Sequence, residues 1–307
     1  MKVSLICPVH NEEESMEELI LSMLNQTKKP DEIIFVEDSS TDRTYEIIEK
    51  YQKKNKLIKV FRVKTRNIAK NRNIAIKNAK YKIIACTDAS SKLREDWLEK
   101  IIKPFEDKTI DVVSGGYIAV SKGGIEDYLS MITVKPMEEW DEETFLPSGR
   151  SIAFRKEAWK KVGGYPENLY TGEDTLFDLK LKEQGFKFKL ARDAIIHWRG
   201  RNTIKKFIKQ FYLYGKGDGE AKNIFKIKSL FFFFILLNLW IIGLIGFLFI
   251  KPFFSLILLI PLLTYFFYSG IKLTIKRKRI GCLFWIPILM LLKRFSYFIG
   301  VWKGVLK

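Results

Sequence analysis

Polar side chains that can bind hydroxyl groups, bases or phosphates stand at the ends of three short apolar runs. These ends are His10–Asn11, Glu37–Asp38 and Asp88–Ser90. Carboxylates can accept hydrogen bonds from hydroxyl and N–H groups, and they can hold a divalent cation on a phosphate. Because the three runs read as buried strands, we expect their ends to meet at one edge of a sheet and to form a ligand site there.

The segments that carry these groups read as alternating strands and helices. This alternation is typical of βαβ units and of a largely parallel sheet covered on both faces, so it predicts an α/β fold. The expected strands are Val3–Val9, Glu32–Glu37, Leu57–Val63, Lys82–Thr87 and Asp111–Val120. The expected helices are Glu12–Asn25, Asp42–Lys54, Ile68–Ala79 and Glu95–Phe105.

The pattern is less regular after Val120. Lys122–Ser148 reads as a loop-rich insertion, and Ile152–Val162 as a strand followed by a helix. Glu173–Gln184 has helical periodicity and ends before Gly185, while Lys187–His197 is expected to contain strands. These elements extend the predicted α/β domain to residue 201.

The composition changes near Lys228, after which the sequence is almost continuously apolar. Ser229–Ile250 and Pro252–Ile271 are uncharged and each is long enough to span a bilayer, which predicts a helical hairpin. Gly281–Leu292 is apolar but too short to span. Cys282–Lys307 is therefore interpreted as an interfacial helix, with a third span as the alternative.

The segment between the domain and the apolar region is basic. Thr203–Glu220 reads as an amphipathic helix or neck, and we expect its glycines, Gly215, Gly217 and Gly219, to make it flexible. The predicted organisation is thus a domain at 1–201, a basic neck at 202–228, a membrane hairpin at 229–271, and a basic loop with an interfacial helix at 272–307.

The formal net charge is +18, and many Lys and Arg residues flank the apolar segments. This placement favours a membrane surface over nucleic acid, for which we find no binding motif. The positive-inside rule then predicts a multi-pass protein of the cell membrane with residues 1–228 in the cytoplasm. The three cysteines form no disulfide framework, and the N-terminal run is too short for a signal peptide.

Six motifs follow one another along the first 201 residues. They are CPVHNEEE, VEDSSTDRT, NIAKNRNIAIKNA, CTDASS, VGGYPE and TGEDTLFDL. Single motifs are weak signals, but the ordered set is specific, and Met1–Arg201 resembles the family 2 glycosyltransferases. The resemblance implies a GT-A fold, a Rossmann-like mixed sheet that binds a nucleoside diphosphate sugar, and it implies inverting sugar transfer.

The resemblance also implies where the nucleotide binds. The residues concerned are Pro8, Val9, Asn11, Glu12, Asp38 and Arg72. In the family the first turn lies against the base, Asp38 contacts the uracil or ribose, and Arg72 neutralises phosphate charge. Structural roles are the alternatives: Asn11 is a favourable helix N-cap, Asp38 suits a turn, and Arg72 could lie on a solvated helix face.

The CTDASS motif departs from the family's DXD pattern, because Ser90 stands where a second carboxylate is usual. By resemblance, Asp88 would hold Mg²⁺ or Mn²⁺ with Ser90 as a weak neutral ligand and His197 completing the shell. Arg199 would grip the diphosphate. The alternative for His197 is a structural role in its strand.

The pair Glu173–Asp174 matches the family's ED motif, which supplies the catalytic base. Neighbouring helical residues point about 100° apart, so only one should face the acceptor. The resemblance favours Asp174, with Glu173 as the second candidate, although both are also acids that suit the first turn of a helix.

Together these features predict a membrane-anchored glycosyltransferase of the hexosyltransferase type. Its donor would be a UDP- or GDP-sugar, and its acceptor a hydroxyl of a lipid-linked or surface glycan. Two alternatives remain: a polyprenyl-phosphate sugar synthase, whose phosphate acceptor needs less of a base, and a catalytically silent membrane scaffold that binds nucleotide sugars.

Overall fold

The computed structural model describes the backbone of residues 1–250 and 252–307, and their side chains except those of residues 233, 244, 247–250, 252–259, 261 and 262. The chain divides into two compact units. Unit 1 comprises Met1–Val120 and Val134–Arg199, and unit 2 comprises Ser121–Thr133 and Gly200–Lys307. The predicted turn residue Lys251 lies outside the described residues.

Unit 1 is built on one sheet with the order β3-β2-β1-β4-β7-β6-β8-β5. Its strands are β1 (Val3–Val9), β2 (Glu32–Asp38), β3 (Ile58–Val63), β4 (Ile83–Thr87), β5 (Ser91–Leu93), β6 (Val112–Val120), β7 (Ser151–Arg155) and β8 (Phe188–Arg199). The first four strands are parallel, which confirms the predicted βαβ half.

The rest of the sheet is mixed rather than parallel. β7 runs antiparallel to both β4 and β6, and β5 runs antiparallel to β8. β7 is antiparallel to β6 because the connection from Val120 to Ser151 does not bring the chain back to the end of the sheet at which β6 began. The prediction of a mixed GT-A-like sheet is confirmed, and the expectation of a largely parallel sheet holds for its first half.

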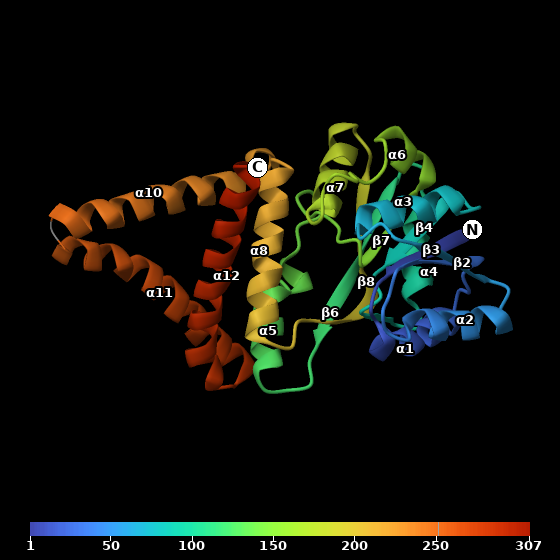
Figure 1. Cartoon of the computed structure of the whole chain (residues 1–307), viewed down its shortest axis with the longest axis horizontal. Coiled ribbons are helices and arrows are strands. Elements are labelled where there is room, and N and C mark those ends of the chain that lie inside the picture. Colours follow the sequence, from blue (N-terminus) through green and yellow to red (C-terminus); the bar gives the residue numbers. More distant parts are fainter. Residues whose placement is uncertain (251) are drawn as a thin grey trace. The chain divides into compact units, whose positions relative to one another are not determined.

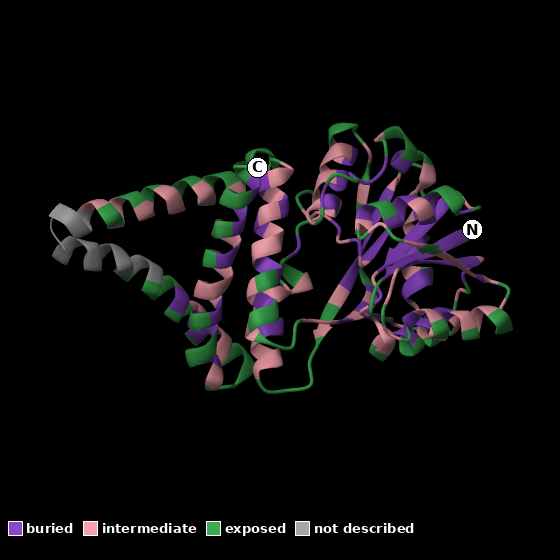
Figure 2. Cartoon of the chain, in the orientation of Figure 1, coloured by how far each residue is buried: buried purple, intermediate pink, exposed green. Residues whose placement is uncertain are grey.

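Helices cover both faces of this sheet (Figure 1). The helices of unit 1 are α1 (Glu13–Leu24), α2 (Thr44–Lys54), α3 (Ile68–Asn78), α4 (Trp97–Ile102), α6 (Lys156–Lys161) and α7 (Glu173–Glu183), with the 3₁₀ turns η1 (Lys103–Glu106) and η2 (Met137–Glu139). One buried core joins the sheet to α1, α2 and α4, and the other joins it to α3, α6 and α7. The strands β1, β2 and β4 between them are buried along their whole length (Figure 2).

Unit 2 is helical. Its helices are α5 (Ile125–Thr133), α8 (Ile204–Glu220), α9 (Asn223–Lys226), α10 (Lys228–Ile250), α11 (Pro252–Arg277) and α12 (Gly281–Val305). The loop-rich insertion predicted at Lys122–Ser148 thus contains a helix, α5, that packs with α12. Asp127 of α5 forms an ion pair with Arg279, and Tyr128 stacks on Trp285.

The glycines of α8 do not form a flexible neck, so that prediction is wrong. Gly215 and Gly219 lie inside α8 against Tyr297 and Val301 of α12, while Gly300 of α12 lies against the backbone of α8. Without side chains, the two backbones approach closely, as small residues four apart allow. The spacing that suggested flexibility instead forms a helix–helix seam, which runs along both helices in Figure 1.

We expect Gly300→Ala to lower the Tm of the purified protein by several degrees. An added Cβ would overlap the Tyr212 carbonyl and crowd the Lys216 nitrogen, and overpacking of this kind costs about 1–3 kcal/mol. Gly246→Ala is the matched control, because a Cβ on that α10 glycine meets no atom of the described side chains and backbone within 4 Å. Thermal unfolding in detergent measures both variants, and equal behaviour of the two would contradict the seam.

Among the described residues, α12 is the helix long and apolar enough to cross a membrane, by length and composition. It has 25 residues, because the apolar segment continues as one helix through Lys293 and Arg294. The helix expected at Cys282–Lys307 corresponds to α12. The predicted spans correspond to α10 and α11, parts of which lie outside the described side chains.

Candidate functional site

The ends of β1 and β2 form the first part of the site. Pro8 and Val9 pair with β2 and are buried, and the chain then turns at Asn11, which has a φ of 52°. The Asn11 side chain accepts a hydrogen bond from the Thr41 amide at 2.8 Å rather than capping α1, which begins after Glu12. The turn is thus held open toward solvent by the β2–α2 loop.

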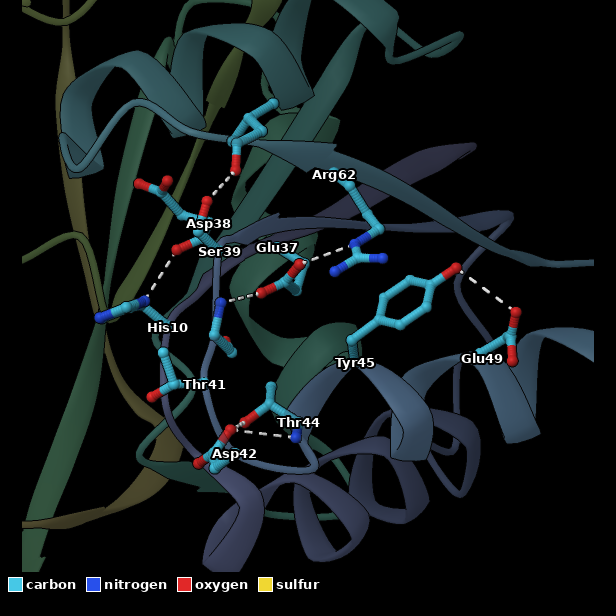
Figure 3. A network of polar contacts seen from close by, with 12 residues as sticks. His10, Glu37, Asp38, Ser39, Thr41, Asp42, Thr44, Tyr45, Glu49 and Arg62 are labelled. Atoms are coloured by element: carbon cyan, nitrogen blue, oxygen red, sulfur yellow. Dashed lines mark hydrogen bonds and ion pairs between the residues drawn. The ribbon is translucent and has the colours of Figure 1, made fainter.

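The imidazole of His10 closes this edge. Its Nδ1 donates to the Asp38 carbonyl oxygen at 2.8 Å (Figure 3). Glu37, fully buried beside it, accepts from the Ser40 amide and pairs with Arg62. The His10 bond joins the end of β1 to the end of β2, and the Glu37 bonds hold the loop that follows β2.

The Asp38 carboxylate faces the interior. It accepts hydrogen bonds from the Thr65 amide at 2.8 Å, the Thr65 hydroxyl at 3.0 Å and the Asn71 amide group at 2.9 Å. Burial favours the neutral acid, but the hydrogen bonds from Asn71 and the 65–66 segment outweigh it and lower the pKa of Asp38. Asp38 is therefore held as a carboxylate, 3% exposed, by α3.

Three consecutive polar residues of α3 are buried, and each bonds to a different part of the site. Asn71 bonds to Asp38. Arg72 bonds to Asp88 through Nη2 at 2.9 Å and to Glu173 through Nη1 at 2.7 Å. Asn73 bonds to both the amide and the carbonyl of Tyr165 in the VGGYPE turn. With only 2% of its side chain exposed, Arg72 does not lie on a solvated helix face.

The two acids of the ED pair, Glu173 and Asp174, differ in burial and in their hydrogen-bond partners. Glu173 is buried against Arg72, whereas Asp174 is half-buried, accepts from the Thr175 amide at 2.8 Å and lies 3.5 Å from the Gly149 amide. Burial raises the pKa of Glu173 to about 7, with the Asp174 charge adding to the rise and Arg72 opposing it. Of the two acids, Asp174 is the more exposed.

Glu173 makes the stability depend on pH. Because its folded pKa is raised from 4.5 to about 7, its contribution to the unfolding free energy is fully present below pH 4.5 and is lost as the pH rises through 7. Asp178, also buried with a raised pKa, acts in the same direction. We expect the Tm in detergent to fall between about pH 5 and about pH 8, and Glu173→Gln to reduce that fall. An unchanged slope would contradict the assignment.

Ser90, His197 and Arg199 line one cavity of about 390 Å³ in unit 1. His197 and Arg199 project to the same side of β8, as strand alternation predicts. The cavity also contains Lys92 and Glu14, which sequence reasoning missed, and Glu14 pairs with Arg199 at 3.4 Å. Asp88, two residues before Ser90, bonds to Arg72 instead and is not among the lining residues.

The residues present fit a divalent cation only together with a diphosphate. Within the described residues, no group of three or more His, Cys, Asp or Glu side chains gathers as a ligand set. Asp88 has one oxygen on Arg72, while Ser90 and His197 face the adjoining cavity. These groups could supply part of a coordination shell, and phosphate oxygens would have to complete it.

A family model described as glycosyl transferase family 2 matches residues 4–163, just over half of the 307-residue chain. The chain belongs to this family. It is therefore a glycosyltransferase with a GT-A-like fold, as the ordered motifs predict.

Relatives of the family extend the match beyond the catalytic unit. A dolichyl N-acetyl-α-D-glucosaminyl phosphate 3-β-D-2,3-diacetamido-2,3-dideoxy-β-D-glucuronosyltransferase of Methanococcus voltae is 26% identical, with 99% of this chain and 97% of that protein covered. The solved structure of S. aureus TarS in complex with UDP-GlcNAc is 25% identical with a TM-score of 0.55, over 70% of this chain and 66% of that one. A Pyrobaculum calidifontis mannosyltransferase, solved with GDP-Man and Mn²⁺, shares the fold at 17% identity, with a TM-score of 0.65 over 99% of this chain and 87% of that one.

One signal in the sequence could have revealed the role of α3. Arg72 stands at a core position of that helix, three residues after Ala69 and four before Ile76, both of which are fully buried. A charge at such a position must be paired inside the protein. Gly149 carried no comparable signal: it is required because a Cβ there would overlap the Arg72 guanidinium.

Proposed function

We propose that this glycosyltransferase moves one sugar, with inversion, from a nucleoside diphosphate sugar to a hydroxyl of a membrane-associated acceptor. The observation that carries the proposal is the arrangement around α7. Arg72 binds Glu173 inside the protein, so that Asp174 remains the accessible acid beside Gly149. An inverting transfer needs one such carboxylate at the acceptor hydroxyl.

In this mechanism the nucleotide lies along the ends of β1 and β2, against Pro8–Glu12 and the segment fixed by Asp38. Asp174 accepts the proton of the acceptor hydroxyl while the hydroxyl oxygen attacks the anomeric carbon from the face opposite the diphosphate. The bond from that carbon to the diphosphate breaks in the same step. Arg199, which lines the same cavity as Ser90, would bind the diphosphate.

A divalent cation on the diphosphate would stabilise the negative charge that develops on the leaving group. Asp88 would hold it, with Ser90 and His197 as weaker ligands. The neighbour solved with GDP-Man and Mn²⁺ supports a cation of this kind, Mg²⁺ or Mn²⁺.

The acceptor is proposed to be a lipid-linked sugar. The Methanococcus voltae relative, whose name specifies a dolichyl phosphate-linked N-acetylglucosamine as acceptor, is similar over 99% of this chain, C-terminal helices included. The complex of TarS with UDP-GlcNAc supports a UDP-sugar as donor. A hydroxyl acceptor also accounts for the separately placed Asp174 better than a phosphate acceptor does.

The membrane attachment is proposed to be α10 and α11, with α12 lying on the cytoplasmic surface. α12 is paired along its length with α8, whose polar residues include Asp218, bonded to Tyr297 at 2.7 Å, and Glu220, paired with Lys307 at 3.0 Å. Lys293, near the middle of α12, donates to the Ile132 carbonyl at 2.8 Å. Charges at mid-helix are costly in hydrocarbon, which favours the interface.

Cysteine accessibility in intact cells tests this topology. In a variant without native cysteines, a cysteine at position 251 is expected to react with a membrane-impermeant reagent, while cysteines at 222, 278 and 307 stay protected until the cells are opened. External labelling of position 222 would overturn the proposed donor supply from the cytoplasm. Labelling of position 307 alone would mean that α12 spans the membrane.

The function is tested by screening nucleotide sugars against the detergent-solubilised full chain. We expect one UDP- or GDP-sugar to raise the Tm in a cation-dependent manner and to be consumed with a lipid-linked sugar acceptor. Transfer to a polyprenyl phosphate alone would favour the synthase alternative. Binding without transfer to any acceptor tried would favour the scaffold.

A further inference from the structure

Four acids surround one buried cation beneath the proposed acceptor site. Arg72 bonds to Asp88 and Glu173, and its guanidinium lies 5.4 Å from the centre of the Tyr165 ring. Asp174 and Asp178 lie one turn apart on the same helix as Glu173. Neither oxygen of Asp178 has a hydrogen-bond partner among the described residues. The Arg72 guanidinium is therefore the cation bonded to a cluster of acids that lie at the end of β4 and on α7.

The two bonds of Arg72 join parts of the chain that are far apart in sequence. Asp88 follows β4 at the edge proposed for the donor, and Glu173 opens α7, which carries the proposed base. The planar guanidinium can bond both carboxylates at fixed angles, which an ammonium group cannot do. Gly149 packs against this guanidinium and also presents its amide to Asp174. A displacement of Arg72 would therefore move both Glu173, next to Asp174 in α7, and Gly149, whose amide faces Asp174.

We propose that Arg72 is a positioning residue of the transfer reaction: it bridges Asp88 and Glu173, and thereby holds the first turn of α7 so that Asp174 faces the acceptor. This inference rests on the proposed function. It differs from the contact to donor phosphate that the sequence suggests, because the Arg72 side chain is 2% exposed and both its terminal nitrogens are bonded to protein acids.

The charge balance gives this role a measurable signature. The titratable and charged groups that interact with Glu173 or Asp174 are Arg72 from α3, Cys86 from β4, Tyr165 from the VGGYPE turn and Asp178 from α7. Asp88 is joined to them through Arg72, and Lys182 through Asp178. Arg72 is the cation bonded to this group. Without it, the negative charge of Glu173 acts on Asp174 with no opposing cation and disfavours the ionised form of Asp174. The acid limb of the kcat profile should then move to higher pH.

The test compares Arg72→Gln, Arg72→Lys and the double variant R72Q/E173Q with the parent, in the full-length protein. For Arg72→Gln we expect kcat at neutral pH to fall tenfold or more and the acid limb to rise by about one pH unit, with donor KM changed by less than about threefold. Arg72→Lys keeps the positive charge but cannot bond both carboxylates as the guanidinium does, so kcat should fall while the acid limb of the kcat profile stays at the same pH. In the double variant the charge of Glu173 is removed as well, and the acid limb should return toward its position in the parent. Lys77→Gln, an exposed cation of the same helix, is the control.

Two results would overturn the proposal. A tenfold rise in donor KM with an unchanged kcat would make Arg72 a phosphate ligand. If the acid limb of the kcat profile stays at the same pH in Arg72→Gln, Arg72 has a purely structural role. If Arg72→Gln does not fold, Arg72→Lys and the double variant still decide, because neither leaves the buried Glu173 charged without a cation. The pH dependence of Tm in the same variants needs no transfer. The charge balance predicts that Tm falls more steeply with pH in Arg72→Gln than in the parent. If the parent fails to transfer sugar, the proposed function is rejected, and this Tm comparison still tests the role of Arg72.

Discussion

Asp174→Asn is expected to lower kcat by a hundredfold or more while nucleotide binding is retained. The substitution keeps the size of the side chain and an oxygen for the Thr175 amide, but it replaces the basic carboxylate by an amide that cannot take up the proton of the acceptor hydroxyl. General-base contributions are of the order of 10²–10⁴ in rate. Because Asp174 is half-buried and not part of the Arg72 bridge, we expect little change in stability.

The measurement pairs steady-state kinetics with the Tm shift caused by the donor nucleotide. Glu173→Gln is the companion variant, since it keeps an oxygen that can accept from Arg72 while removing the charge. We expect Glu173→Gln to be milder than Asp174→Asn. The reverse order would assign the base to Glu173, and a mild effect of both would favour transfer to a phosphate acceptor.

Asp88→Ala is expected to abolish transfer. Asp88 is the acid that remains in the DXD-like turn, and it also neutralises part of the Arg72 charge at 2.9 Å. Its removal would therefore take away the proposed cation ligand and leave the buried guanidinium with one partner instead of two. Initial rates with and without added Mn²⁺ or Mg²⁺ measure the loss.

The two roles of Asp88 are separated by a second variant and by chelation. Asp88→Asn keeps an oxygen for Arg72, so it should fold like the parent and still lose most activity. EDTA should inhibit the parent, and added cation should restore it. Activity that survives both Asp88→Asn and EDTA would reject the cation. Ser90→Asp should be tolerated, because it restores the usual second carboxylate in the turn.

Much of the fold of unit 1 follows from the sequence, because local patterns specify it. The apolar run Val3–Val9 is observed as β1 with the same bounds, and the helices predicted at Ile68–Ala79 and Glu173–Gln184 are observed as α3 and α7 within one residue. Strand periodicity and helix periodicity depend on residues a few positions apart, so they can be predicted without knowledge of distant partners.

The candidate site follows from the sequence only in part. The polar strand ends and the ordered motifs indicate which residues gather at one edge, because parallel strands present their carboxyl ends together. They do not show which side chains bond to each other. Arg72 illustrates the difference: its type suggested a phosphate contact, whereas its place on the core side of α3 turns it inward to Asp88 and Glu173.

The tertiary structure alone decided the contacts between distant segments. Ser90 and His197 share a cavity because β5 pairs with β8, although 107 residues separate the two. Likewise, the glycines of α8 face the backbone of α12, so a spacing that suggested flexibility forms a close-packed seam. A glycine's sequence neighbours do not show whether its missing side chain leaves a loop free or lets another helix approach, since that depends on what packs against it.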